Sequence, residues 1–138
     1  MVEISQRKWI DLDITALANL TKSVYIFEGL GEYSLEQIEQ HLRTLNERFP
    51  FEVVFVAIHD GTLVGWVGVE RQTENIGEIG RWHPYVANIC QRDEIAESLI
   101  SEVMNYAKEN GMNRLEISFG DISDTSMKAY NKRCLWLK

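Results

Sequence analysis

The sequence predicts an α/β fold, an α+β arrangement in which helices cover the faces of one mixed β-sheet. Segments with helical periodicity and segments with strand periodicity follow one another along the chain. Between residues 76 and 119 the order is strand, helix, strand, and a right-handed crossover places the two strands of such a unit parallel in one sheet. The complete expected order is β-α-α-β-β-β-α-β-α.

The N-terminal part of the chain predicts an edge strand followed by two helices. Residues 2 to 8 suit a short strand, and apolar side chains at roughly helical spacing then predict a helix over residues 13 to 27. Ser34 and Gln37, three positions apart, have the pattern of a capping box. The apolar stripe that follows them predicts a second helix over residues 35 to 48.

The middle of the chain predicts a β-hairpin and a third strand. Two β-rich runs, FEVVFVAIH and TLVGWVGVE, are joined by Asp60-Gly61, which is a strong hairpin signal. A third run, from residue 76 to residue 87, follows a short polar turn. Three strands are therefore expected here in succession.

A long amphipathic helix is predicted next. Apolar residues from 95 to 107 mark its buried face, and Asn110-Gly111 closes it. The run RLEISF, residues 114 to 119, then alternates as a strand does, and residues 127 to 137 suit a last helix.

Composition and charge indicate one globular domain over residues 1 to 138. The chain is 45% hydrophobic and 25% charged, which is enough apolar material for a core. Its formal net charge is -7, so nucleic acid and anionic membranes are not expected as partners. No signal peptide and no run of roughly 20 apolar residues is present, which predicts a cytoplasmic protein. Cys90 and Cys134 lack metal-ligand spacing, so no metal is expected.

The most specific pattern in the chain is the stretch HPYVANICQRDEIAESLISEVMNYAKENGMNRLEISF. It resembles the diagnostic segment of the GNAT superfamily of acyltransferases, in which a strand leads into a Gln/Arg-x-x-Gly-x-Gly/Ala loop, a helix, a turn and another strand. The resemblance spans most of residues 2 to 130 and implies acetyl-CoA as the co-substrate. The residues that it implies for binding acetyl-CoA are Val86, Ala87, Gln91, Arg92, Asp93, Glu94, Ile95 and Ala96.

In the family, this loop directs main-chain N–H groups at the CoA diphosphate, as helix N-termini do for anions in general. Arg92 is expected to add a charged contact. Glu94 departs from the family pattern, because it stands where the first Gly is usual. The alternative interpretation is that Gln91 and Glu94 only cap the helix.

The C-terminal end also departs from the family pattern. Family members usually continue from the last helix into two more strands, whereas this sequence ends at YNKRCLWLK. A C-terminally short domain leaves the strand at residues 114 to 119 with an open edge. This edge predicts a homodimer or a truncated chain.

Acyl transfer to an amine requires a base, a donor to the developing oxyanion and a proton for the thiolate. The resemblance implies Glu78 as the base. In the family the oxyanion donor is a main-chain N–H near the end of this strand. Since Pro84 has no N–H, the resemblance implies the N–H of Val86 or of a neighbour. Further candidates for the base are His83 and Glu70. The resemblance implies Tyr130 as the proton donor to the thiolate.

The predicted function is transfer of an acetyl group from acetyl-CoA to a primary amine of a small molecule or protein. The loop EGLGEY, residues 28 to 33, is the expected acceptor site, and its two glutamates favour a cationic amine. Strand aromatics such as Trp66 are expected in the core instead. Two alternatives stay open: a non-catalytic module of the same fold that binds CoA or protein, and a structural α/β domain with the same element order.

Overall fold

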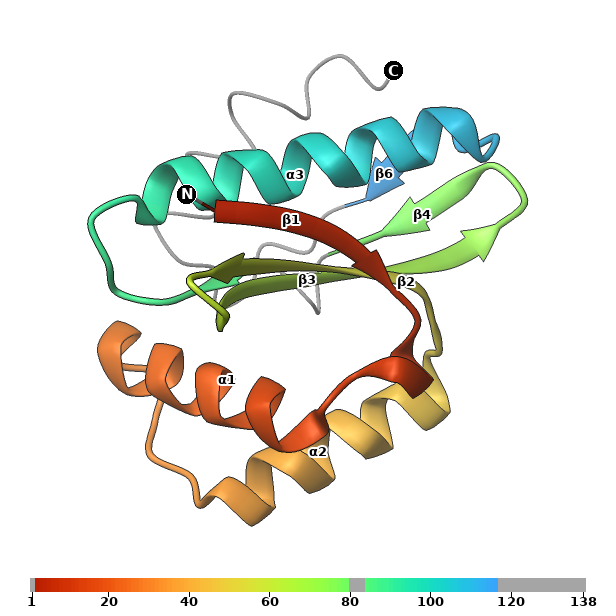
Figure 1. Ribbon diagram of the computed structural model, residues 1–138. Helices are drawn as coiled ribbons and strands as arrows, with labels where there is room; N and C mark the ends of the chain where they lie inside the picture. Colours follow the sequence, from red (N-terminus) through yellow and green to blue (C-terminus); the bar gives the residue numbers. More distant parts are fainter. Residues whose placement is uncertain (1, 80–83, 117–138) are drawn as a thin grey trace.

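The computed structural model describes residues 2–79 and 84–116, and it contains elements at every predicted position in those ranges (Figure 1). A short 3-10 helix, Trp9–Asp11, links the first strand to the first helix. The last predicted helix lies outside the described residues. In chain order the elements are β1 (Val2–Arg7), α1 (Ile14–Glu28), α2 (Leu35–Arg48), β2 (Phe51–His59), β3 (Thr62–Thr73), β4 (Ile76–Glu78), β5 (Tyr85–Val86), α3 (Arg92–Glu109) and β6 (Arg114–Glu116).

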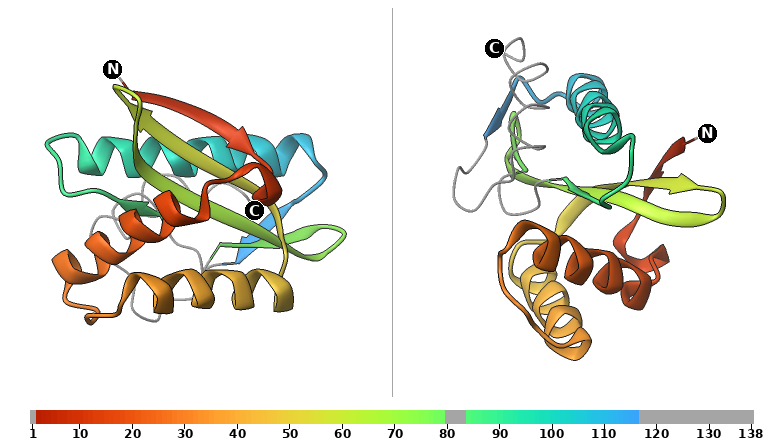
Figure 2. Two further views of the ribbon diagram at one scale, coloured as in Figure 1. Left: turned by 60° about the horizontal axis from the view of Figure 1, so that its bottom comes forward. Right: turned by 90° about the vertical axis from the view of Figure 1, so that its left-hand side faces the viewer.

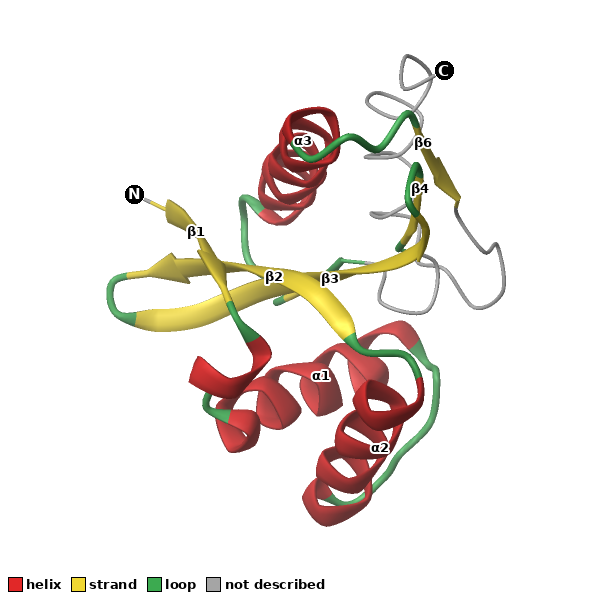
Figure 3. Ribbon diagram, turned by 90° about the vertical axis from the view of Figure 1, so that its right-hand side faces the viewer, coloured by secondary structure: helices red, strands yellow, loops and turns green. Residues whose placement is uncertain are grey.

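One mixed sheet organises these elements. Its strand order is β1-β2-β3-β4-β6, and β5 pairs with β3 beside this path. β4 and β6 are parallel, whereas the other described pairs are antiparallel. α3 lies on one face of the sheet, and α1 and α2 lie on the other (Figure 3). The predictions of a mixed sheet and of a parallel crossover unit are therefore confirmed.

The third predicted strand is wrong as a single element. The structure has two short strands there, β4 and β5, and both pair with β3. Glu78 and Val86 are eight positions apart along the chain, but their partners on β3, Glu70 and Gly65, are only five positions apart. A continuous ladder cannot absorb this difference. Pro84, which has no N–H to donate to a ladder, stands directly before β5.

Alternation along β3 divides the interior into two cores, one on each face of the sheet (Figure 2). Between Gly65 and Glu70, odd-numbered residues face α3 and even-numbered residues face α1 and α2. The core on the α3 side includes Val53, Phe55, Val67, Val69, Ile79, Val86, Leu99 and Met104. The core on the α1 and α2 side includes Leu17, Val24, Ile38, Leu42, Val54, Val56, Trp66 and Tyr85.

Gly65 is required where α3 approaches the sheet. A Cβ atom at this position would lie 3.2 Å from Leu99 and 3.3 Å from Ile95, which is tighter than nine in ten such contacts. A glycine in a strand commonly marks a place where another element comes this close. The first turns of α3 therefore pack directly onto β3, next to β5.

Buried Trp66 holds α1 against the opposite face. Its side chain is fully buried and stacks on Tyr85 of β5 with 5.2 Å between the ring centroids. Trp66 Nε1 donates a hydrogen bond to Thr21 Oγ1 at 3.0 Å, and this hydroxyl donates to the carbonyl of Leu17 at 2.8 Å. The prediction that Trp66 is a core residue is confirmed, and α1 is fixed beneath β5.

Both ends of the loop between α1 and α2 are defined by capping. α1 ends at Gly29, which has a φ of 71° that glycine adopts without strain. At the start of α2, the Ser34 side chain accepts from the N–H of Gln37, and the Gln37 side chain accepts from the N–H of Ser34. The predicted capping box is confirmed.

Candidate active site

The end of β5 presents its backbone away from the sheet. The N–H of Ala87 donates to the carbonyl of Val64 at 2.8 Å, so this group is used within the sheet. Because successive peptide groups of a strand point to opposite edges, the N–H and C=O of Val86 point away from β3. The carbonyl oxygen of Val86 accepts from Arg92 Nε at 3.0 Å on that outer side. The N–H of Val86 is thus directed at the space beside β5.

A tight turn carries the chain from β5 into α3. The N–H of Ile89 donates to the carbonyl of Ala87 at 2.9 Å, and the N–H of Arg92 donates to the carbonyl of Ile89 at 3.1 Å. Helical bonding then begins with the N–H of Ile95 and the carbonyl of Gln91 at 2.9 Å. The N–H groups of Asp93 and Glu94, between these two bonds, lie at the N-terminus of α3, where helices commonly bind anions.

The residues of the predicted CoA loop have different environments. Ile95 and Ala96 are buried and pack in the core between α3 and the sheet. Asp93 and Glu94 are exposed and place two carboxylates in the first turn of α3. Gln91 is the N-cap residue but makes no side-chain capping bond. Gln91 and Glu94 thus occupy the N-cap and first-turn positions that the capping alternative expects, although the Gln91 side chain makes no capping bond.

Arg92 is turned into the protein. Its side chain is 14% exposed and that of Glu28 is 6% exposed, and Arg92 Nη2 forms an ion pair with Glu28 Oε1. The guanidinium carbon also lies 4.8 Å from the ring centroid of Phe27. Together with the hydrogen bond to Val86, these contacts connect the start of α3, β5 and the end of α1. Arg92 would have to leave these contacts to reach a diphosphate.

The predicted acceptor loop begins at the same place. Glu28 points into the protein toward Arg92, whereas Glu32 is exposed. The loop is also tied to α1, because Lys22 Nζ donates to the carbonyl of Tyr33. Glu32 is thus the glutamate of this loop that faces solvent.

Two carboxylates are buried on the face of the sheet that carries α1 and α2. Within residues 2–79 and 84–116, Glu70 at 5% exposure and Glu78 at 8% are the acidic residues that are buried as whole residues, in addition to the buried side chain of Glu28. They lie directly opposite each other on β3 and β4, and Gln72 Nε2 donates to Glu78 Oε2. Buried carboxylates are uncommon in proteins as a whole. Where they do occur, they are often part of a functional site. The structure therefore brings together two of the three candidate bases.

The two halves of the candidate site are separated along β3. Glu78 is opposite Glu70, and Val86 is opposite Gly65, which corresponds to about 17 Å of strand. A proton released beside Val86 therefore needs an intermediate carrier, such as water, to reach Glu78. His83, which stands between Glu78 and Val86 in the sequence, lies outside the described residues, as does Tyr130.

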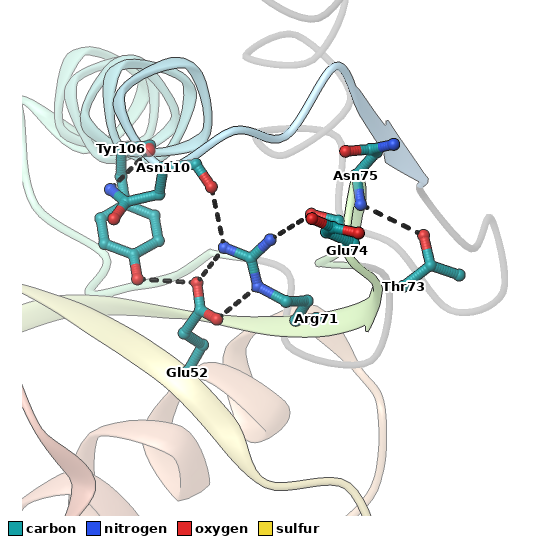
Figure 4. A network of polar contacts seen from close by, with 7 residues as sticks. All are labelled: Glu52, Arg71, Thr73, Glu74, Asn75, Tyr106 and Asn110. Carbon is teal, nitrogen blue, oxygen red and sulfur yellow. Dashed lines mark hydrogen bonds and ion pairs between the residues drawn. The ribbon is translucent and has the colours of Figure 1, made fainter.

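A second polar cluster, missed by sequence reasoning, fastens the other end of α3 (Figure 4). Arg71 of β3 binds Glu52 of β2 through two bonds, Nε to Oε1 at 2.5 Å and Nη2 to Oε2 at 2.9 Å. Tyr106 of α3 donates its hydroxyl to Glu52 Oε2 at 2.7 Å, and Arg71 Nη2 donates to the carbonyl of Asn110 at 3.1 Å. The cluster joins β2, β3 and the C-terminal end of α3.

This cluster shifts the ionisation of its members. The hydrogen bonds from Arg71 hold the pKa of Glu52 below its ordinary value of 4.5, and the hydroxyl of Tyr106 lowers it further. Burial raises the pKa of Tyr106 to about 12, and its hydrogen bond to Glu52 contributes to the same shift. The folded structure therefore favours a charged Glu52 beside a neutral Tyr106.

Comparison with known proteins decides the family. Residues 15–134 match the model of the acetyltransferase (GNAT) family. The chain belongs to the GNAT acetyltransferase family. This membership makes it an acyltransferase of a family that uses acetyl-CoA, and the resemblance inferred from the Gln91 to Ala96 loop is confirmed.

Solved structures confirm the GNAT fold. The ribosomal-protein-alanine N-acetyltransferase from Brucella melitensis biovar Abortus 2308 is 22% identical, with a TM-score of 0.71 over 97% of this chain and 91% of the other. An aminoglycoside acetyltransferase, meta-AAC0020 from an uncultured soil metagenomic sample, in complex with sisomicin, is 18% identical, with a TM-score of 0.69 over 96% and 86%. A predicted acetyltransferase from Clostridium acetobutylicum, with acetyl-CoA, is 15% identical, with a TM-score of 0.66 over 96% and 88%. No curated protein matches the sequence.

Residues 2–79 and 84–116 of this GNAT domain contain neither a membrane-spanning helix nor a cluster of metal-ligand side chains. No helix there is both long enough and apolar enough to cross a membrane. No group of three or more His, Cys, Asp or Glu side chains in those residues is arranged to hold a metal ion.

The Glu52 cluster predicts an acid-dependent loss of stability. Because the folded pKa of Glu52 is lowered, its contribution is present above the unfolded value of 4.5 and is lost as the pH falls through the folded value. Glu52→Gln should lower the free energy of unfolding by about 1 kcal/mol at pH 7, a value that allows for solvent screening. Urea unfolding from pH 7 to pH 3 should show this difference shrinking. Glu102→Gln, at an exposed position of α3, is the matched control, and parallel pH curves for both variants would contradict the prediction.

Proposed function

We propose that this GNAT domain transfers an acetyl group from acetyl-CoA to a primary amine of a small molecule or protein. The observation that carries the proposal is the pair of buried carboxylates, Glu70 and Glu78, on the face of the sheet that also packs α1. An acyl transfer needs a base on the side from which the acceptor amine approaches. The proposed acceptor loop begins where α1 ends, and α1 packs on the same face of the sheet as these carboxylates. Family membership supports the same reaction class.

The main chain of the site fits acetyl-CoA better than its side chains do. Val86 directs its N–H beside β5, and the first turn of α3 directs N–H groups at its N-terminus, so both suit an anionic or polarised ligand. Asp93 and Glu94 instead bring negative charge to the place where a diphosphate would lie. Both residues are exposed to solvent. Binding is therefore expected to rest on the backbone.

The proposed roles follow the chemistry of direct acyl transfer. Acetyl-CoA supplies an electrophilic thioester carbonyl. The N–H of Val86 donates to the oxygen on which negative charge develops, and Glu78 accepts the amine proton through water. Gln72 orients the carboxylate of Glu78 by its hydrogen bond. His83 as an alternative base, and Tyr130 as the proton donor to the thiolate, complete the proposal.

The acceptor is proposed to be a cationic amine. Glu32 in the acceptor loop is exposed, and the chain carries a net charge of -7, which favours the approach of cations. Among the similar structures are an aminoglycoside acetyltransferase and a ribosomal-protein-alanine acetyltransferase. This proposal is tested by comparing the acetylation rates of polyamines, aminoglycosides and basic peptides with those of neutral amines.

Acetyl-CoA binding tests the first half of the proposal. Calorimetric titration of the wild type should show micromolar binding, and Glu94→Gly should lower the Kd about fivefold by removing one like charge. Glu94→Gln removes the charge and keeps the bulk, so it separates the two effects. Glu36→Gly, an exposed first-turn position of α2, is the control and should bind as the wild type does. Absence of binding in the wild type and in both Glu94 variants would sink the proposal and favour the non-catalytic module.

The base is tested by a substitution that keeps its size. Glu78→Gln should lower kcat by about 100-fold or more with little change in the KM for acetyl-CoA, because general-base catalysis contributes on that scale. Release of free CoA thiol with the best amine from the screen measures the rate. Glu74→Gln, on the exposed turn between β3 and β4, is the matched control. Equal rates for wild type and Glu78→Gln would assign the base elsewhere.

We further propose a cytoplasmic homodimer that pairs through β6. β6 is the last strand in the order of the described sheet, and such an edge offers N–H and C=O groups to a second chain. Sedimentation of the complete chain at micromolar concentration should give a species of two chains. A single species of one chain would contradict the dimer.

A further inference from the structure

The contacts of Arg92 are more specific than core packing requires. One guanidinium donates to the carbonyl of Val86, pairs with Glu28 and covers the ring of Phe27. These partners come from β5 and from the last turn of α1, and Val86 and Glu28 are 58 positions apart in the sequence. The carbonyl that Arg92 holds belongs to Val86, the residue whose N–H is the proposed oxyanion donor, and Glu28 opens the proposed acceptor loop.

Glu28 is unfavourably placed unless it serves this pair. It is the last residue of α1, and a carboxylate at the C-terminal end of a helix is opposed by the negative end of the helix dipole. Its side chain is also 6% exposed, so its charge is largely removed from water. A buried charge of this kind requires a partner, and Arg92 supplies it across two elements.

The shape of arginine matters here as much as its charge. The planar guanidinium directs separate N–H groups along fixed directions, so Nε holds the carbonyl of Val86 while Nη2 holds Glu28. A lysine ammonium is a single point charge and cannot hold both partners in this geometry. The guanidinium therefore fixes the carbonyl of Val86 and the end of α1 relative to each other.

We propose that Arg92 is a positioning residue for acyl transfer, which orders the acyl-CoA side and the acceptor side of the site as one unit through Val86 and Glu28. This inference rests on the proposed function. It assigns Arg92 a different role from a contact to the diphosphate. A diphosphate contact acts mainly on the affinity for acetyl-CoA, whereas a positioning role acts on the reaction step.

Steady-state kinetics of Arg92→Lys and Glu28→Gln separate the two roles. A positioning role predicts that both variants lower kcat by about tenfold or more, with the KM for acetyl-CoA changed less than about threefold. Both variants should also show faster amide hydrogen exchange at residues 26 to 33. Arg43→Lys, the same substitution at an exposed position of α2, is the matched control and should leave kcat and exchange unchanged.

The outcomes distinguish this inference from the proposed function. A wild type without acyl-CoA turnover overturns the proposed function. An active wild type whose Arg92→Lys variant shows only a raised KM for acetyl-CoA overturns the positioning role and restores the diphosphate contact. In that case Glu28→Gln should lower the KM, because the arginine is released. Unchanged kcat in both variants, with normal exchange at residues 26 to 33, overturns the inference as well.

Discussion

The register around β3 is the constraint on which the rest of the structure depends. This strand pairs with β2 along one edge and with both β4 and β5 along the other. Its alternation decides which side chains meet α3 and which meet α1 and α2. Because Glu70 lies on the α1 and α2 side, its partner Glu78 lies there too. The buried carboxylate pair is therefore a consequence of sheet register.

Two arginines hold α3 in place, one at each end. At the C-terminal end, Arg71 binds Glu52 with both side chains 27% exposed, so water screens the pair and its contribution is modest. At the N-terminal end, Arg92 and Glu28 are much less exposed, and removal of one partner would leave a charge with poor hydration. The first arrangement chiefly fastens a helix. The second also sets the geometry of the candidate site.

The fold was predictable because its information is local. Helical and strand periodicity placed the elements, and the Ser34 capping box and the Asp60-Gly61 turn placed their ends. The family loop at Gln91 to Ala96 was a local pattern too. The division of the third strand was not predictable, because it depends on how many residues of β3 lie between the partners of β4 and β5.

The candidate site was only partly predictable, because its decisive contacts are not local. Glu78 and Glu70 were both named as candidates, but their direct opposition follows from strand register and bulges that the sequence does not display. The pair of Arg92 and Glu28 joins residues 64 positions apart. No local pattern distinguishes an arginine that points into solvent from one that points inward, so a phosphate contact was the natural expectation.

The inward orientation of Arg92 affects how the two proposed substrates share the site. Asp93 and Glu94, which follow it in the chain, are exposed, as is Glu32 of the acceptor loop, and the guanidinium of Arg92 is paired with Glu28. This distribution opposes an anionic nucleotide and favours a cationic amine. In the proposed function, acetyl-CoA is then held by main-chain N–H groups, whose directions are fixed by the fold. When the backbone makes the contacts, a loop held rigidly in position contributes more to binding affinity than an additional surface charge does. The contacts of Arg92 provide that rigidity.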